Sequence, residues 1–159
     1  MKGSEGFKHI ALKRFEVFLD QHSYRKTSER FAVLEELYSL DRHIDVESLF
    51  VVMRNKKYSI SRATIYNTLD LLVQCGLAVK HQFREQNALY EQALVYQHHD
   101  HLVCNDCDVI KEFTDPRTDD IKKTVSEELQ TEIKNHSLVF YGDCLIPNCE
   151  NKRNSSDKS

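Results

Sequence analysis

The sequence predicts an α+β protein in which a winged-helix domain comes first and a metal-binding domain follows. Residues 1–92 show four stretches of helical periodicity and then a hairpin pattern, and the region after them holds two close pairs of cysteines. The charge divides in the same way: residues 1–88 carry 14 Lys/Arg and 11 Asp/Glu, or +3, and residues 89–159 carry 8 and 14, or −6. A mildly basic half followed by an acidic, ligand-rich half suggests two tasks in one polypeptide.

Helical periodicity and capping residues define the helices of the front half. Apolar residues at helical spacing predict a first helix over residues 7–22. The N-cap residues predicted for the next three helices are, in order, Thr27, Asp45 and Ser61. The fourth helix, over residues 62–75, stops at Gly76. Its core face is predicted to carry Ile65, Leu69 and Leu72.

A hairpin signal follows this helix, with LAVKHQF and ALYEQAL on either side of a four-residue turn, REQN. Helices followed by a hairpin form a winged helix, whose last helix normally enters the DNA major groove. That helix turns Arg62, Tyr66 and Asn67 away from the core, which suits contact with base edges and thymine methyl groups. The alternative is a solvated helix face in a protein-interaction domain. A net charge of +3 indicates weak DNA binding by one copy, so a homodimer is expected.

Basic residues also lie near the start of the second helix, at Arg25, Lys26 and Arg30. They could hold phosphates or reach into the minor groove.

The four C-terminal cysteines predict a structural zinc site. Cys104 and Cys107 form one pair, and Cys144 and Cys149 form the other, with 36 residues between the pairs. That length allows a helix and a strand to return to the first pair, and two such thiolate pairs close a tetrahedral site. The alternative is two disulfides in a secreted protein, but the N-terminus lacks an apolar signal segment, so we expect a cytoplasmic protein. The fifth cysteine, Cys75, is expected in the core.

The segment before the first cysteine predicts two further metal sites. If it is a strand, His99 and His101 share one face, and His98 and Asp100 share the other. The first face has candidate partners in Glu112, Glu91 and His43, and three His with two Glu suit Fe(II), Mn(II) or Zn(II). The second face has candidates at the two ends of a helix predicted over residues 119–135, namely Asp119 and His136. His22 and His81 are taken as structural or surface residues.

With these residues identified, the chain resembles the ferric uptake regulator family over nearly its whole length. The matching segments are RKTSER, HIDVESLF, SRATIYNTLDLL, LYEQ, HHDHLVCNDCDVIKEF and NHSLVFYGDC, together with the closing cysteine. HHDHLVC followed by a second cysteine, and then by Glu five residues later, is the most specific of them.

The resemblance implies a homodimeric, metal-dependent repressor of iron-uptake genes. Its parts would be a winged helix with hinge over residues 1–92, an α/β dimerisation domain over 93–150 and a disordered tail over 151–159. The implied DNA is a double-stranded AT-rich inverted repeat, with Arg25 in its minor groove and Tyr66 on thymine methyls. The structural zinc would be bound by Cys104, Cys107, Cys144 and Cys149. The regulatory cation, Fe(II) or else Mn(II) or Zn(II), would be bound by His43, Glu91, His99, His101 and Glu112. The third site would consist of His98, Asp100, Asp119 and His136.

Two positions bear on which branch of the family is meant. Asn67 resembles the peroxide-responsive branch, whereas Glu112 stands where peroxide sensors usually carry Asp. Peroxide-responsive and zinc- or manganese-responsive regulators are therefore the near alternatives, and a zinc hydrolase is a distant one. The sequence predicts a regulator and not an enzyme, and no apolar run approaches the length of a membrane span.

Overall fold

The computed structural model describes residues 2–40, 43–83, 87–94, 99–134, 136–147 and 149. The chain divides into two compact units, Met1–Tyr96 and Gln97–Ser159, and each is described here by itself. This division follows Tyr96, whereas the sequence prediction ended the first domain at residue 92. His98 and the predicted tail, 151–159, lie outside the described residues.

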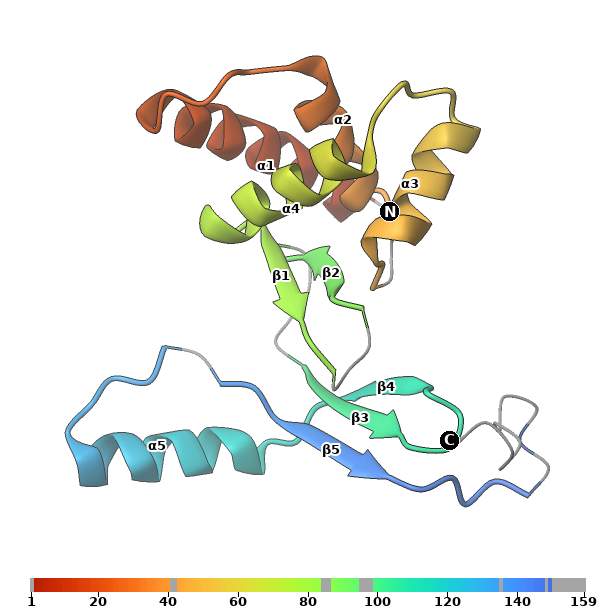
Figure 1. Cartoon of the computed structure of the whole chain (residues 1–159). Coiled ribbons are helices and arrows are strands. Elements are labelled where there is room, and N and C mark those ends of the chain that lie inside the picture. The colour runs from red at the N-terminus through yellow and green to blue at the C-terminus, as the bar shows by residue number, and fades with distance from the viewer. Residues whose placement is uncertain are drawn as a thin grey trace. The chain divides into compact units, whose positions relative to one another are not determined.

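Helices make up most of the first unit (Figure 1). Within its described residues they are α1 (Lys2–Gln21), α2 (Ser28–Leu37), α3 (Val46–Asn55) and α4 (Arg62–Gln74). The predicted N-caps are confirmed. Thr27 accepts a hydrogen bond from the backbone N–H of Arg30, and Asp45 and Ser61 accept one from residues 48 and 64 at 2.7 and 3.1 Å.

The helices enclose an apolar core. Ile65, Leu69 and Leu72 of α4 are fully buried, as the sequence predicted, and Cys75 packs against the same core. The apolar stripe of α1 is buried only in part: Phe15 is buried, but Phe7 is 39% exposed. Phe7 lies on the same face of α1 as Phe15, about two turns nearer the N-terminus. The apolar face of α1 is therefore longer than the part of it that the other helices cover.

The predicted hairpin follows α4. Gly76, at φ 68°, ends the helix in the left-handed conformation that glycine adopts without strain. The strands β1 (Ala78–His81) and β2 (Leu89–Gln92) then pair antiparallel, with His81 opposite Leu89. On the other edge of β2, Ile44 and Tyr90 exchange two backbone hydrogen bonds of 3.0 and 2.8 Å. The segment that enters α3 is therefore fixed beside the hairpin.

The second unit contains a small sheet and one helix among its described residues (Figure 1). They are β3 (Asp100–Cys104), β4 (Ile110–Phe113), α5 (Arg117–Leu129) and β5 (Val139–Gly142). The sheet order is β4-β3-β5, with β4 antiparallel and β5 parallel to β3. A helix and a strand thus lead back to the first cysteine pair, as the 36-residue spacing predicted.

The predicted bounds of the helix in this unit were wrong. The sequence predicted residues 119–135, whereas α5 begins at Arg117 and ends at Leu129. It starts early because the Asp115 carboxylate accepts the Arg117 backbone N–H at 2.9 Å. It stops early because Gln130 is left-handed, at φ 49°. Among the described residues, no helix is both long and apolar enough to cross a membrane.

Candidate metal centres and DNA-facing surface

Three cysteines meet at one end of the β3–β5 pair. The sulfur atoms of Cys104, Cys107 and Cys144 all lie within 4.8 Å of one another. Tetrahedral zinc with bonds of about 2.3 Å would hold its sulfurs about 3.8 Å apart. No disulfide joins the five cysteines, all of which are described. The donor set therefore fits a structural zinc ion.

Backbone geometry and side-chain hydrogen bonds hold the two cysteine segments together. Cys104 and Gly142 are partners in the β3–β5 ladder, which brings the segment before Cys144 beside the first pair. The Asp106 carboxylate accepts the Cys144 backbone N–H at 3.0 Å. After Cys107 the chain turns at Asp108, which is left-handed at φ 55° and donates its N–H to the Cys104 carbonyl at 3.1 Å. The thiols are thus preorganised by groups that are not ligands.

The thiols also influence one another electrostatically. A hydrogen bond from Cys107 lowers the pKa of Cys104, so Cys104 is the thiolate-favouring member. A backbone hydrogen bond from Val109 lowers the pKa of Cys107, but the Cys104 thiol, burial and the Cys149 thiol outweigh it and raise that pKa to about 11. Cys149, the fourth predicted ligand, contributes to the raised pKa of Cys107 but is not among the three cysteines whose sulfurs lie within 4.8 Å of one another.

Within the first unit, two histidines surround one carboxylate. Nε2 of His43 lies 3.4 Å from Oε2 of Glu91, and Nε2 of His81 lies 2.6 Å from Oε1. His43 precedes the Ile44–Tyr90 bridge, which brings it to Glu91 on β2. His43 and Glu91 were predicted site residues, whereas His81 was predicted to be a structural or surface residue. No sequence signal identifies this contact, because a four-residue turn would put the two residues on opposite faces. The observed hairpin register makes His81 and Glu91 diagonal neighbours on one face.

Within the second unit, a second set of nitrogen and oxygen donors lies on β3 and β4. His101 is the register partner of Glu112, and Nε2 of His99 lies 3.9 Å from Oε1 of Glu112. The rings of His99 and His101 are 4.8 Å apart between centroids. The structure thus brings together the three ligands predicted in this unit. Their donors suit Fe(II), Mn(II) or Zn(II).

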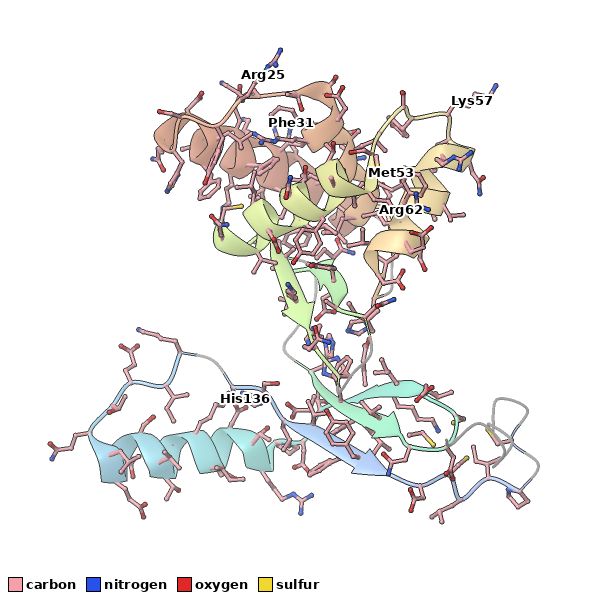
Figure 2. The ribbon with its side chains drawn as sticks, viewed as in Figure 1. Arg25, Phe31, Met53, Lys57, Arg62 and His136 are labelled. Carbon is pink, nitrogen blue, oxygen red and sulfur yellow. The ribbon has the colours of Figure 1, made fainter. Side chains whose placement is uncertain are left out.

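The residues of the predicted third site are only partly gathered. Nε2 of His136, in the segment between α5 and β5 (Figure 2), lies 3.1 Å from Oδ1 of the buried Asp100. The Asp119 carboxylate lies on an exposed part of α5 and pairs with Lys122 at 2.5 Å. His98 lies outside the described residues.

The surface predicted to read bases belongs to α4. Tyr66 is 45% exposed and Asn67 is exposed beside it. Nζ of Lys80, on β1, lies 5.6 Å from the centre of the Tyr66 ring and 3.8 Å from the Asp70 carboxylate. The ammonium group of Lys80, from the β1–β2 hairpin, therefore lies near Tyr66 on this surface.

The two arginines predicted to contact DNA differ in whether they already bind a group of the protein. Arg25 lies between α1 and α2 and points away from the helices (Figure 2). Arg62 instead donates two hydrogen bonds, at 2.5 and 2.6 Å, to the Glu47 carboxylate, and its guanidinium lies 3.9 Å from the centre of the Phe50 ring. This ion pair lowers the pKa of Glu47. Arg62 would have to leave Glu47 before it could bind a phosphate or a base.

Comparison with known proteins places these features in a family. Residues 21–141 match the model of the ferric uptake regulator family. The ferric uptake regulation protein of Vibrio anguillarum is 31% identical over 130 residues, 81% of this chain and 87% of that protein. That of Campylobacter jejuni is 30% identical over 146 residues, 91% of each chain. The solved Vibrio cholerae ferric uptake regulator superimposes with a TM-score of 0.66 at 30% identity, covering 79% of this chain and 96% of the other.

Proposed function

The chain belongs to the ferric uptake regulator family, and we propose that Fe(II) is the cation that it senses and that iron-uptake genes are the genes that it represses. As a member it is a metal-responsive, DNA-binding transcriptional repressor that acts as a dimer. It is a regulator and not an enzyme, which excludes the zinc hydrolase. We expect it in the cytoplasm, where it would reach the genes that it represses.

The observation that carries the proposal is the division of nitrogen and oxygen donors between the two units. His43 and Glu91 belong to the first unit, and His99, His101 and Glu112 belong to the second. We propose that these five residues bind the regulatory cation together. The cation would supply a strong attraction that neither set offers alone, since imidazoles and carboxylates do not otherwise hold one another tightly in water.

Joint binding would fix the angle between the two units. In a dimer that angle sets the distance between the two α4 helices, which must match half-sites spaced by turns of the DNA helix. Without joint binding the units would sample many angles, and DNA affinity would fall with the fraction that fits. A hundredfold response requires about 2.7 kcal/mol of coupling. The solved Vibrio cholerae relative, described as showing a rearrangement of its DNA-binding domains, supports motion of this kind.

The proposed DNA is an AT-rich inverted repeat. Tyr66 and Asn67 would contact base edges and thymine methyl groups in the major groove, and Arg25 would reach into the narrow minor groove. Arg62 would join them on leaving Glu47. A homodimer presents this set twice, related by a two-fold axis, which is why an inverted repeat is expected. A dimer bound at such a site would block access of RNA polymerase.

The two remaining metal sites would have different roles. Cys104, Cys107, Cys144 and Cys149 would bind zinc permanently and stabilise the second unit. His98, Asp100, Asp119 and His136 are proposed as a third site, whose support is the Asp100–His136 contact.

A peroxide-responsive regulator is the second candidate. The observation that favours it is Asn67, an exposed residue of α4 that resembles the residue of the peroxide-responsive branch at this position. It predicts a mass gain on His43 or His99 when the Fe(II)-loaded protein meets peroxide. An unchanged mass on both histidines excludes it.

The test of the proposal is fluorescence-anisotropy binding of the zinc-loaded protein to an AT-rich inverted-repeat duplex at fixed salt. Fe(II), Mn(II) and Zn(II) are titrated separately without oxygen, against a chelated control. We expect tighter binding at micromolar free Fe(II), and His43→Ala should abolish that gain while leaving the dimer and its zinc intact. Activation by trace Zn(II) alone would replace iron by zinc as the signal. Equal binding with and without metal, or undiminished activation of His43→Ala, would contradict joint binding.

A further inference from the structure

His81 lies on β1 at a position that brings its imidazole to the carboxylate of Glu91. In the hairpin Val79 is opposite Glu91, so His81, two residues on, is on the same face of the two strands. Its Nε2 lies 2.6 Å from Oε1, while Nε2 of His43 lies 3.4 Å from Oε2 of the same carboxylate. Both oxygens of Glu91 therefore face an imidazole nitrogen.

The orientation of His81 is fixed by its surroundings. Its ring stacks on that of Phe83, with centroids 5.6 Å apart and planes 3° from parallel. The rings of His43 and His81 are 5.2 Å apart and cross at 71°, which keeps them from stacking on each other. The side chain of His81 is 14% exposed, that of His43 12% and that of Glu91 6%. The imidazole of His81 is therefore mostly buried and has a fixed orientation, unlike that of a solvated surface histidine.

We propose that His81 is an additional ligand of the regulatory cation, so that the first unit alone presents two histidines and one carboxylate. This inference rests on the proposed function, because it concerns the same cation. Two imidazoles and a carboxylate from three separate segments form a set that Fe(II) and similar cations accept while leaving positions open. His99, His101 and Glu112 would then complete a site that the DNA-binding unit has already begun, so metal binding precedes fixation of the domain angle.

The competing explanation is that His81 only orients Glu91 through a hydrogen bond. A residue that supports a ligand costs about 10- to 100-fold in metal affinity when it is removed. Glutamine separates the two roles, since its side-chain amide can donate a hydrogen bond to Glu91 but is a poor ligand for these cations. If His81 acts only by orientation, His81→Gln restores what His81→Ala loses. If it is a ligand, the two variants are equally impaired.

The first experiment uses the zinc-loaded full chain without oxygen and Co(II) as the probe. The affinity of the regulatory Co(II) is measured from its visible absorption, and its imidazole ligands are counted by X-ray absorption. His81→Gln and His81→Ala should each lose at least ~100-fold in affinity, and the imidazole count should fall by one. His9→Gln, on the exposed surface of α1, is the matched control and should bind as the original chain does.

A second variant tests whether the first unit binds the cation by itself. His99→Ala, His101→Ala and Glu112→Ala together remove the ligands of the second unit. This triple variant should retain weakened Co(II) binding, and adding His81→Gln should abolish it.

The contrary outcomes separate this inference from the proposal on which it rests. Full affinity and an unchanged imidazole count in His81→Gln would overturn the role of His81 as a ligand, while a lost response in His43→Ala would leave the proposed function standing. A chain that binds no Co(II) beyond the cysteine site would overturn both.

Discussion

The two units of this chain hold themselves together by different means. The first encloses an apolar core to which every one of its four described helices contributes buried side chains. In the second, Val103 is the one fully buried apolar residue among those described, and α5 contributes none. Apolar side chains are instead exposed there, including Ile121 at 61%, Leu129 at 68% and Phe140 at 51%. A unit with so little core is expected to need a bound metal ion or a second copy of the chain for its stability.

This contrast fits the proposed placement of the metal sites. A zinc ion bound by four thiolates would supply folding free energy that a small core cannot supply, and its proposed ligands belong to the unit with little core. The first unit has a core of its own, so its proposed ligands could share with the second unit a cation that binds and dissociates. If the units are independent, a substitution in one of them should leave the other unchanged.

Removal of a zinc ligand should disrupt the second unit alone. Cys104→Ser should lose its zinc and its dimer, since structural zinc contributes roughly 10–16 kcal/mol in small zinc-binding peptides. The helical signal of the first unit should persist. Zinc content, light scattering and circular dichroism measure the three effects. Cys75→Ser is the control, because Cys75 lies outside the cluster and donates to the Leu72 carbonyl at 3.4 Å, as a serine also can. A dimeric, metal-responsive Cys104→Ser protein would contradict the dependence on zinc.

A cavity in the core should have the opposite selectivity. Leu69→Ala removes a fully buried side chain of α4 and should lower the free energy of unfolding of the first unit by about 2–5 kcal/mol. Zinc content and dimerisation should not change, because the second unit does not rely on this core. Urea denaturation followed by helical circular dichroism measures the loss. A simultaneous loss of zinc would show that the units fold as one.

A single buried hydrogen bond should matter less. The Tyr38 hydroxyl donates to the Leu77 carbonyl at 2.8 Å, joining the end of α2 to the end of α4. Tyr38→Phe removes this donor, but the Ala93 N–H still donates to the same carbonyl at 3.1 Å, so the loss should be about 0.5–1.5 kcal/mol at pH 7.

The same tyrosine gives a pH dependence of known sign. Burial raises the pKa of Tyr38 to about 12, whereas an unfolded tyrosine ionises near pH 10. Its stabilisation is complete below pH 10 and is lost as the pH rises toward 12, since only the unfolded chain then releases the proton. Urea denaturation of both proteins at pH 7 and at pH 11 should therefore find a smaller difference at pH 11. If the two proteins differ in unfolding free energy by the same amount at both pH values, the Tyr38 hydroxyl is exposed to water and not buried.

Backbone strain offers the smallest test. Gln130 ends α5 in the left-handed conformation, at φ 49°, and Lys57 follows α3 in the same conformation, at φ 65°. Gln130→Gly should stabilise α5 by roughly 0.5–1 kcal/mol, because the steric cost that it relieves exceeds the entropy that glycine adds to the unfolded chain. Hydrogen exchange should slow in α5 only, and Lys57→Gly should slow it in α3 only. Slower exchange in both units from one substitution would contradict their independence.

Much of the fold was predictable because its signals are local. The capping side chains of Thr27, Asp45 and Ser61 act within three residues, so sequence spacing alone identifies them. The alternation along β3 likewise predicts which histidines share a face, and the grouping of His101 with Glu112 follows it. The end of α5 was not predictable, because no glycine marks the left-handed residue there.

The sequence by itself determined the family, the caps and the order of elements, since each depends on residue type and on spacing along the chain. For the same reason it predicted the cysteine and histidine ligand sets. Tertiary structure decided the position of His81 beside Glu91. A four-residue turn would place Lys80 opposite Glu91 and His81 on the other face, but the strands pair one residue away, with Val79 opposite Glu91. A shift of one residue exchanges the two faces of a strand, and only the packed hairpin fixes which register forms. The same holds for Arg62: its residue type suits DNA, but the neighbouring α3 supplies the Glu47 carboxylate that binds it.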